Sequence, residues 1–117
     1  MLRDFDETRV RAALIRAWSL QTAKQWTSDT SAAGQCNVIA VVAHDLYGGD
    51  ILCTKVPGYE VDHYYNRIAG AVVDLTDSQF SEPVIYDDES ASREDAMSCV
   101  LNSEYEELRQ ALLDHLN

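Results

Sequence analysis

Apolar side chains near the start of the chain recur with the spacing of an α-helix. Asp6 is a residue type that caps helix N-termini, and Glu7 places negative charge in the first turn, where the helix dipole favours it. The pattern predicts a helix over residues 6–20 with one buried stripe. The stripe consists of Val10, Leu14, Ala17 and Trp18.

A second, almost uninterrupted apolar run covers residues 34–49. Its β-branched residues would suit a strand, but the run is longer than most buried strands, and this length favours a helix. Gly48 is a typical residue type for a helix end. Because the run is apolar on nearly every side, we expect a central helix buried on most of its surface, with Cys36 in its first turn.

The pattern changes to that of strands after Gly49. We expect strands over residues 51–56, 63–68 and 71–76, the last two joined as a hairpin around Ala69-Gly70. Residues 83–86 fit a short edge strand that begins with a proline.

The remaining sequence predicts two C-terminal helices. Ser92 is a typical cap for the first, and Ser103 with Glu106 has the spacing of a capping box for the second. The predicted fold is therefore α+β: a central Cys-bearing helix packs on a small antiparallel sheet of three or four strands, between N- and C-terminal helices. With 117 residues, 46% of them hydrophobic, the chain is expected to form a single domain over residues 1–117.

Charge is concentrated in the second half of the chain. The net charge is -11; residues 1–60 hold 7 acids and 6 bases, whereas residues 61–117 hold 13 acids and 3 bases. Nucleic acids and anionic membranes are bound by basic surfaces, so we expect neither as a partner. The acidic half predicts a solvated helix face, with a contact surface for a basic protein partner as the alternative.

The three cysteines are odd in number and scattered, which predicts reduced thiols and a cytoplasmic protein. This agrees with the lack of an apolar run long enough for a membrane span or a signal peptide. Cys53 and Cys99 lie in apolar patterns and are expected in the core. We expect no cofactor and no metal, because Cys36, His44, Cys53 and His63 do not have the spacing of zinc ligands.

Cys36, His63 and Asp74 form the candidate catalytic set. The first turn of a helix favours a thiolate, a histidine can share the thiol proton, and a carboxylate fixes the histidine tautomer. Pairing around Ala69-Gly70 places His63 and Asp74 diagonally on one face of the hairpin. Asp74 lies in an apolar strand and needs a partner, which is His63, Arg67 or a backbone N–H.

Several short blocks follow one another along the chain: Trp18-Ser19, Thr22, Trp26, Gly34-Gln35-Cys36, Gly48-Gly49, His63-Tyr64-Tyr65-Asn66 and Asp74-Leu75-Thr76 with Gln79-Phe80. In this order they resemble the YunG family of small bacterial proteins. The resemblance covers residues 18–80, and Ser92-Arg93-Glu94 is similar to a further segment of the family.

More remotely, the plan resembles papain-like and transglutaminase-like cysteine enzymes. That resemblance implies Cys36 as nucleophile, His63 as base and Asp74 as the orienting residue. The backbone N–H of Cys36 is the first candidate oxyanion donor, and Gln35, Gln25 and Trp26 are further candidates for contacts with the oxyanion or substrate.

The leading functional hypothesis is acyl transfer by a cysteine enzyme that acts on an amide or thioester, in a peptide or a small molecule. One alternative is a catalytically inactive binding module that uses the acidic C-terminal half. The other is a protein that uses Cys36 in redox or thiol-modification chemistry.

Overall fold

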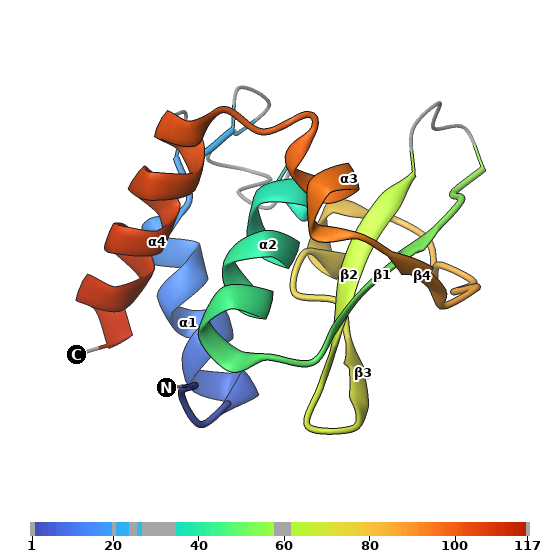
Figure 1. The fold of residues 1–117 in the computed structure, drawn as a ribbon, viewed down its shortest axis with the longest axis horizontal. Coiled ribbons are helices and arrows are strands. Elements are labelled where there is room, and N and C mark those ends of the chain that lie inside the picture. Colours follow the sequence, from blue (N-terminus) through green and yellow to red (C-terminus); the bar gives the residue numbers. More distant parts are fainter. Residues whose placement is uncertain (1, 20, 24–25, 27–34, 58–61, 117) are drawn as a thin grey trace.

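The computed structural model describes residues 2–19, 21–23, 26, 35–57 and 62–116 (Figure 1). Within these residues the fold is α+β, with a four-stranded antiparallel sheet in the order β3-β2-β1-β4. Helix α2 lies between the sheet on one side and α1 and α4 on the other. In chain order the elements are α1 (Glu7–Ala17), α2 (Cys36–Tyr47), β1 (Asp50–Thr54), β2 (His63–Ile68), β3 (Ala71–Val73), the 3-10 helix η1 (Asp77–Gln79), β4 (Glu89–Ala91), α3 (Arg93–Met97) and α4 (Asn102–Leu116).

Helix α1 confirms the predicted cap and stripe and ends earlier than predicted. The Asp6 side chain accepts a hydrogen bond from the backbone N–H of Arg9, and the four stripe residues are buried. The helix ends at Ala17, because Trp18 has an extended backbone. Just beyond, the Thr22 hydroxyl bonds to both the N–H and the carbonyl of Ser19, which gives the chain a local turn instead of another helical turn.

Helix α2 is the central buried helix that the sequence predicts. Eight of its twelve residues are buried, it begins at Cys36, and it ends at Gly48 with a φ of 80°. The amide of Asn66 in β2 donates to the carbonyl of Ala40 at 3.0 Å and fixes the helix to the sheet. At Gly49 a Cβ would lie 1.9 Å from the Arg67 carbonyl oxygen, so only glycine allows β1 to approach β2 at this point.

The hairpin of β2 and β3 has the predicted register. Ile68 pairs with Ala71, and Asn66 pairs with Val73, across a two-residue turn at Ala69-Gly70. Both turn residues have positive φ, 52° and 82°, as a tight turn of this hand requires. Strand β3 ends at Val73 rather than at residue 76, because the Asp74 carboxylate accepts from the backbone N–H of Thr76 and turns the chain.

The predicted edge strand at residues 83–86 is wrong. The edge strand is β4, which pairs with β1. In the segment before it, side chains of the sheet hold the backbone in an irregular path. The Thr54 hydroxyl binds the Ile85 carbonyl and the Asp87 N–H, and the Tyr65 hydroxyl accepts from the Asp88 N–H.

Two further predictions in the C-terminal half need correction. Helix α4 begins at Asn102, so Ser103 lies inside it, and Glu104 instead accepts from the backbone N–H of Leu101 at 2.9 Å. Cys99 is exposed between α3 and α4, because the chain turns there, whereas Cys53 is buried as predicted. The Ser92 cap of α3 is confirmed.

We predict that Leu14→Ala lowers the free energy of unfolding by about 2–5 kcal/mol, because it leaves a cavity in the core between α1, α2 and α4. Leu14 is 0% exposed and its neighbour Ile15 is 63% exposed, so Ile15→Ala is a matched control that should change stability by less than about 0.5 kcal/mol. Urea denaturation of both variants measures the difference. Equal losses would contradict the assigned helix face.

Candidate functional site

The structure brings Cys36, His63 and Asp74 together from three parts of the fold. Cys36 is the first residue of α2, His63 is the first residue of β2, and Asp74 follows β3. Nε2 of His63 lies 2.7 Å from Oδ2 of Asp74, and both side chains are at least 95% buried. Cys36 is half-buried, and its thiol is close enough to the His63 ring to raise the pKa of the imidazole. Because Nε2 faces Asp74, Nδ1 is the ring nitrogen available to the thiol.

The charged forms of His63 and Asp74 stabilise each other. Burial lowers the pKa of His63, but its hydrogen bonds to Asp74 and to Cys36 outweigh burial and raise that pKa from 6.5 to about 9. Burial raises the pKa of Asp74, but the His63 ring and two further donors keep it below its usual value. Both shifts favour the charged pair, an imidazolium against a carboxylate.

Asp74 is the most heavily bonded side chain of the site. Its Oδ1 accepts from the backbone N–H and the hydroxyl of Thr76, at 3.1 and 3.2 Å. Its Oδ2 accepts from His63 and from the hydroxyl of Tyr86 at 2.6 Å. These four donors meet the requirement that a buried carboxylate be paired. Arg67, the alternative partner in the sequence prediction, instead contacts Asp50.

Aromatic rings enclose the imidazole. Phe80 meets His63 edge to face with ring centroids 4.8 Å apart, and Tyr65 lies nearly parallel to His63 at 6.0 Å. Tyr86 in turn meets Tyr65 at 4.8 Å. Nothing in the sequence pattern marked Tyr86 for this place, because it lies in an irregular segment twelve residues after Asp74. The one available signal was the need of Asp74 for partners.

Beside the thiol, Asn37 is a second residue that the sequence analysis missed. The Cys36 Sγ lies 3.2 Å from Oδ1 of Asn37, to which it donates. The Asn37 amide nitrogen donates to the carbonyl of Ala96, so its orientation is fixed by α3. The thiol is therefore placed between an amide oxygen and the His63 ring.

The three side chains predicted to contact an oxyanion or a substrate lie in different surroundings or outside the described residues. Gln35 is fully buried next to Cys36, and among the described residues neither polar atom of its side-chain amide has a hydrogen-bond partner. Trp26 is half-buried against the main core, with its indole N–H likewise unpaired within the described part of the chain. Gln25 lies outside the described residues.

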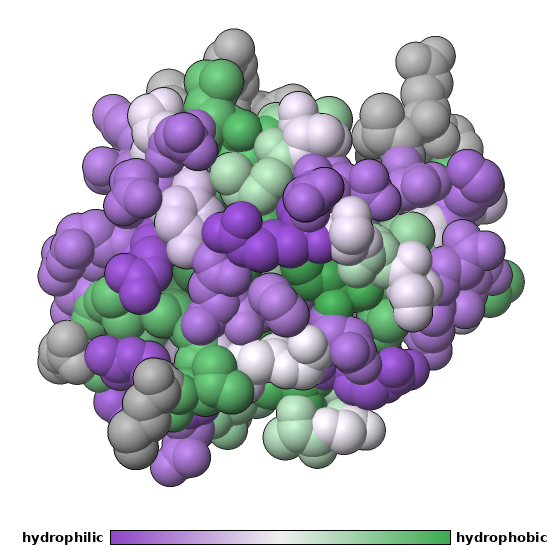
Figure 2. Space-filling view, in the orientation of Figure 1, coloured by the Kyte–Doolittle hydropathy of each residue, from purple (hydrophilic) through white to green (hydrophobic). Residues whose placement is uncertain are grey.

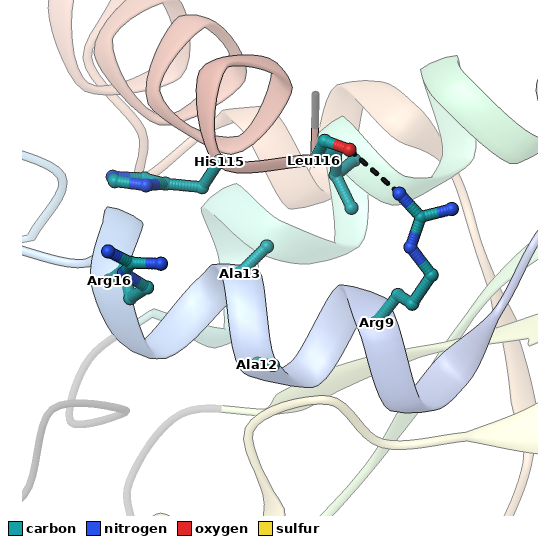
Figure 3. Close-up of a pocket in the computed structure, with 6 residues that line it drawn as sticks. All are labelled: Arg9, Ala12, Ala13, Arg16, His115 and Leu116. Atoms are coloured by element: carbon teal, nitrogen blue, oxygen red, sulfur yellow. Dashed lines mark hydrogen bonds between the residues drawn. The ribbon is translucent and has the colours of Figure 1, made fainter.

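A pocket of about 200 Å³ lies between α1 and α4, and its lining contains none of the three candidate catalytic residues. Figure 3 shows Arg9, Arg16 and His115 around it, with Arg9 bonded to the Leu116 carbonyl at 2.9 Å. Cations at this place complement the negative end of the α4 dipole. The pocket is therefore explained by helix packing and capping.

The described residues offer neither a group of metal ligands nor a helix that could span a membrane. Across those residues no three His, Cys, Asp or Glu side chains are grouped so that they could hold a metal ion. In the same part of the chain, no helix combines the length and the apolar character needed to cross a membrane.

Comparisons with known proteins agree on one family. The family model described as YunG protein matches residues 6–117. The chain is 38% identical over 108 residues to the protein titled "Uncharacterized protein YunG" from Bacillus subtilis (strain 168), and the match covers 92% of each chain. No solved structure matches the chain.

We predict that Asp74→Asn destabilises the protein more at about pH 6 than at about pH 9.5. Folding raises the pKa of His63, so its contribution to the free energy of unfolding is fully present below pH 6.5 and is lost as pH rises through about 9. Removing the carboxylate removes that contribution, so the two losses should differ by about 2–3 kcal/mol. Chemical denaturation at both pH values gives the comparison.

The control is Asp62→Asn, which removes an exposed carboxylate that pairs with Lys55. An exposed ion pair contributes less than about 1 kcal/mol, so this variant should lose little stability at either pH. A loss in Asp74→Asn that is the same at both pH values would show that His63 is not held as an imidazolium.

Proposed function

The chain belongs to the YunG family, and we propose that it is a cysteine-dependent acyl-transfer enzyme acting on an amide or a thioester. The observation that carries the proposal is one buried imidazole that is hydrogen-bonded to Asp74 and close enough to the Cys36 thiol for the thiol to raise its pKa. A thiol next to an imidazolium and at a helix N-terminus is in the environment that stabilises a thiolate. A remote likeness to papain-like and transglutaminase-like enzymes is part of this proposal.

The proposed reaction has two steps. The Cys36 thiolate attacks the acyl carbon and forms a C–S bond, and the leaving amine or thiolate takes a proton from the His63 imidazolium. In the second step water or an acceptor amine attacks the thioester. His63 takes a proton from that nucleophile, and the Cys36 thiolate leaves. Asp74 keeps the imidazole oriented throughout and stabilises its charged form.

The negative oxygen that develops on the acyl carbon needs hydrogen-bond donors. The backbone N–H of Cys36 is one candidate, since the first N–H groups of a helix have no partner within the helix. Gln35 is the second, because its amide is buried beside Cys36 and unpaired among the described residues. Trp26 is a third candidate, because its indole N–H is unpaired within the described part of the chain.

The alternative of an inactive binding module rests on the acidic second half. Figure 2 shows hydrophilic side chains over most of one face, with hydrophobic ones in patches between them. Yet three of the eight acids in residues 87–107 have internal partners: Asp87 accepts from Thr54, Asp88 from Tyr65, and Glu104 from the Leu101 backbone. These three acids therefore stabilise the fold and are not free to bind a basic partner. Because this weakens the case for a binding module, we keep acyl transfer as the proposal.

We predict that iodoacetamide modifies Cys36 at about pH 7 at least about tenfold faster than it modifies Cys99, because only Cys36 has an imidazolium partner. Cys99 is an exposed cysteine in the same molecule, so it controls for access and reagent. His63→Ala should remove the advantage. Peptide mass spectrometry over time gives both rates, and equal rates in the wild-type chain would refute an activated thiol.

We also predict that an activated ester such as p-nitrophenyl acetate acetylates one residue per chain, Cys36, in a rapid first phase. The reason is that a thiolate nucleophile forms the acyl intermediate faster than water releases it. Intact-mass and peptide spectra locate the acetyl group, and Cys36→Ser is the matched control. Labelling that is unchanged in Cys36→Ser would contradict the mechanism, whereas a reactive but never acylated Cys36 would favour redox or thiol-modification chemistry.

A further inference from the structure

The segment of residues 85–88 is fixed to the sheet on both sides of Tyr86. The Thr54 hydroxyl lies 3.2 Å from the carbonyl oxygen of Ile85 and 2.9 Å from the backbone nitrogen of Asp87. The Tyr65 hydroxyl accepts from the Asp88 N–H at 2.7 Å and donates to the Asp88 carboxylate at 2.6 Å. Tyr86 is therefore placed by four hydrogen bonds that it does not itself make.

From this position Tyr86 contacts the candidate site. Its hydroxyl donates to Oδ2 of Asp74 at 2.6 Å, the same oxygen that faces the His63 ring at 2.7 Å. The other carboxylate oxygen is held separately by Thr76. The Thr76 contacts therefore orient Asp74 without Tyr86. What the Tyr86 hydroxyl changes is the environment of Oδ2, the oxygen that also contacts His63.

We propose that Tyr86 is a positioning residue whose hydroxyl, by sharing Oδ2 of Asp74 with His63, limits how firmly the carboxylate holds the imidazolium. The positive end of the O–H dipole lies beside that oxygen and offsets part of its charge. His63 then releases its proton more readily than it would beside an unshared carboxylate. This role rests on the proposed function, in which His63 must give a proton and take it back.

Other groups around the pair contribute to its charge balance. Arg11 of α1 donates to the backbone carbonyl of Asp74 and pairs with Asp77. Among the described residues, the other titratable groups facing the pair or its immediate contacts are Cys36 from α2, Tyr65 from β2, and Asp87 and Asp88 from the segment that carries Tyr86. All of these groups are retained when only the Tyr86 hydroxyl is removed. A difference in the His63 titration between the wild-type chain and such a variant therefore reports the effect of that hydroxyl.

The test is an NMR titration of the His63 ring in Tyr86→Phe and in the wild-type chain. The variant keeps the ring that packs on Tyr65 and loses only the hydroxyl. A neutral hydrogen bond contributes about 0.5–1.5 kcal/mol, so His63 should bind its proton about two- to tenfold more tightly in the variant. Thermal unfolding followed by circular dichroism establishes that both proteins are folded.

Tyr105→Phe is the matched control. Its hydroxyl also donates to a carboxylate, that of Asp45, but this carboxylate pairs with Arg93 and contacts neither His63 nor Asp74. The control should lose stability and leave the His63 titration unchanged. If Tyr86→Phe loses stability while His63 binds its proton equally or less tightly, Tyr86 is only an anchor of its segment, and the inference is overturned.

The titration needs no reaction at Cys36, so the two proposals fail separately. A tighter proton on His63 in Tyr86→Phe, together with a Cys36 that is inert in both proteins, would overturn acyl transfer and support the effect of Tyr86 on His63. An activated Cys36 with an unchanged His63 titration would support acyl transfer and overturn the role of Tyr86.

Discussion

The structure around the candidate site depends on one constraint: the Asp74 carboxylate is buried and must be paired. Four donors reach it, from Thr76 by two groups, from His63 and from Tyr86. Each donor fixes part of the chain. Thr76 turns the backbone out of β3. Tyr86 links the carboxylate to the segment that Thr54 and Tyr65 hold on the sheet, and His63 links it to β2. A lone carboxylate at this depth would cost several kcal/mol, so the burial of Asp74 requires hydrogen-bonding partners of this kind.

The second element of the arrangement is the buried helix α2. Its residues face α1 and α4 on one side and the sheet on the other, so its first turn has a fixed position relative to β2. The hydrogen bond from Asn66 to the Ala40 carbonyl fixes α2 to the sheet. The hydrogen bond from Asn37 to the Ala96 carbonyl fixes the start of α2 to α3. A thiol at the start of this helix is held near the imidazole by packing rather than by a flexible loop.

Periodicity and turn chemistry predicted most of the fold. The stripe of α1, the continuous apolar character of α2 and the Ala69-Gly70 turn are local signals, and the register of the hairpin follows from that turn. The same register placed His63 and Asp74 within reach of each other. The failed prediction of an edge strand depends on contacts distant in sequence. Residues 83–86 have strand propensity, but the side chains of Thr54 and Tyr65 take the backbone groups that a ladder would need. Tyr86 could not be assigned for the same reason.

The central claim is that one imidazole joins the Cys36 thiol to the Asp74 carboxylate and is charged near neutral pH. The most direct measurement is the ¹⁵N NMR spectrum of the His63 ring in the wild-type chain at about pH 7.5. The structure predicts a hydrogen on both ring nitrogens, because the two partners raise the pKa of His63 to about 9. A ring with one unprotonated nitrogen at that pH would contradict the account.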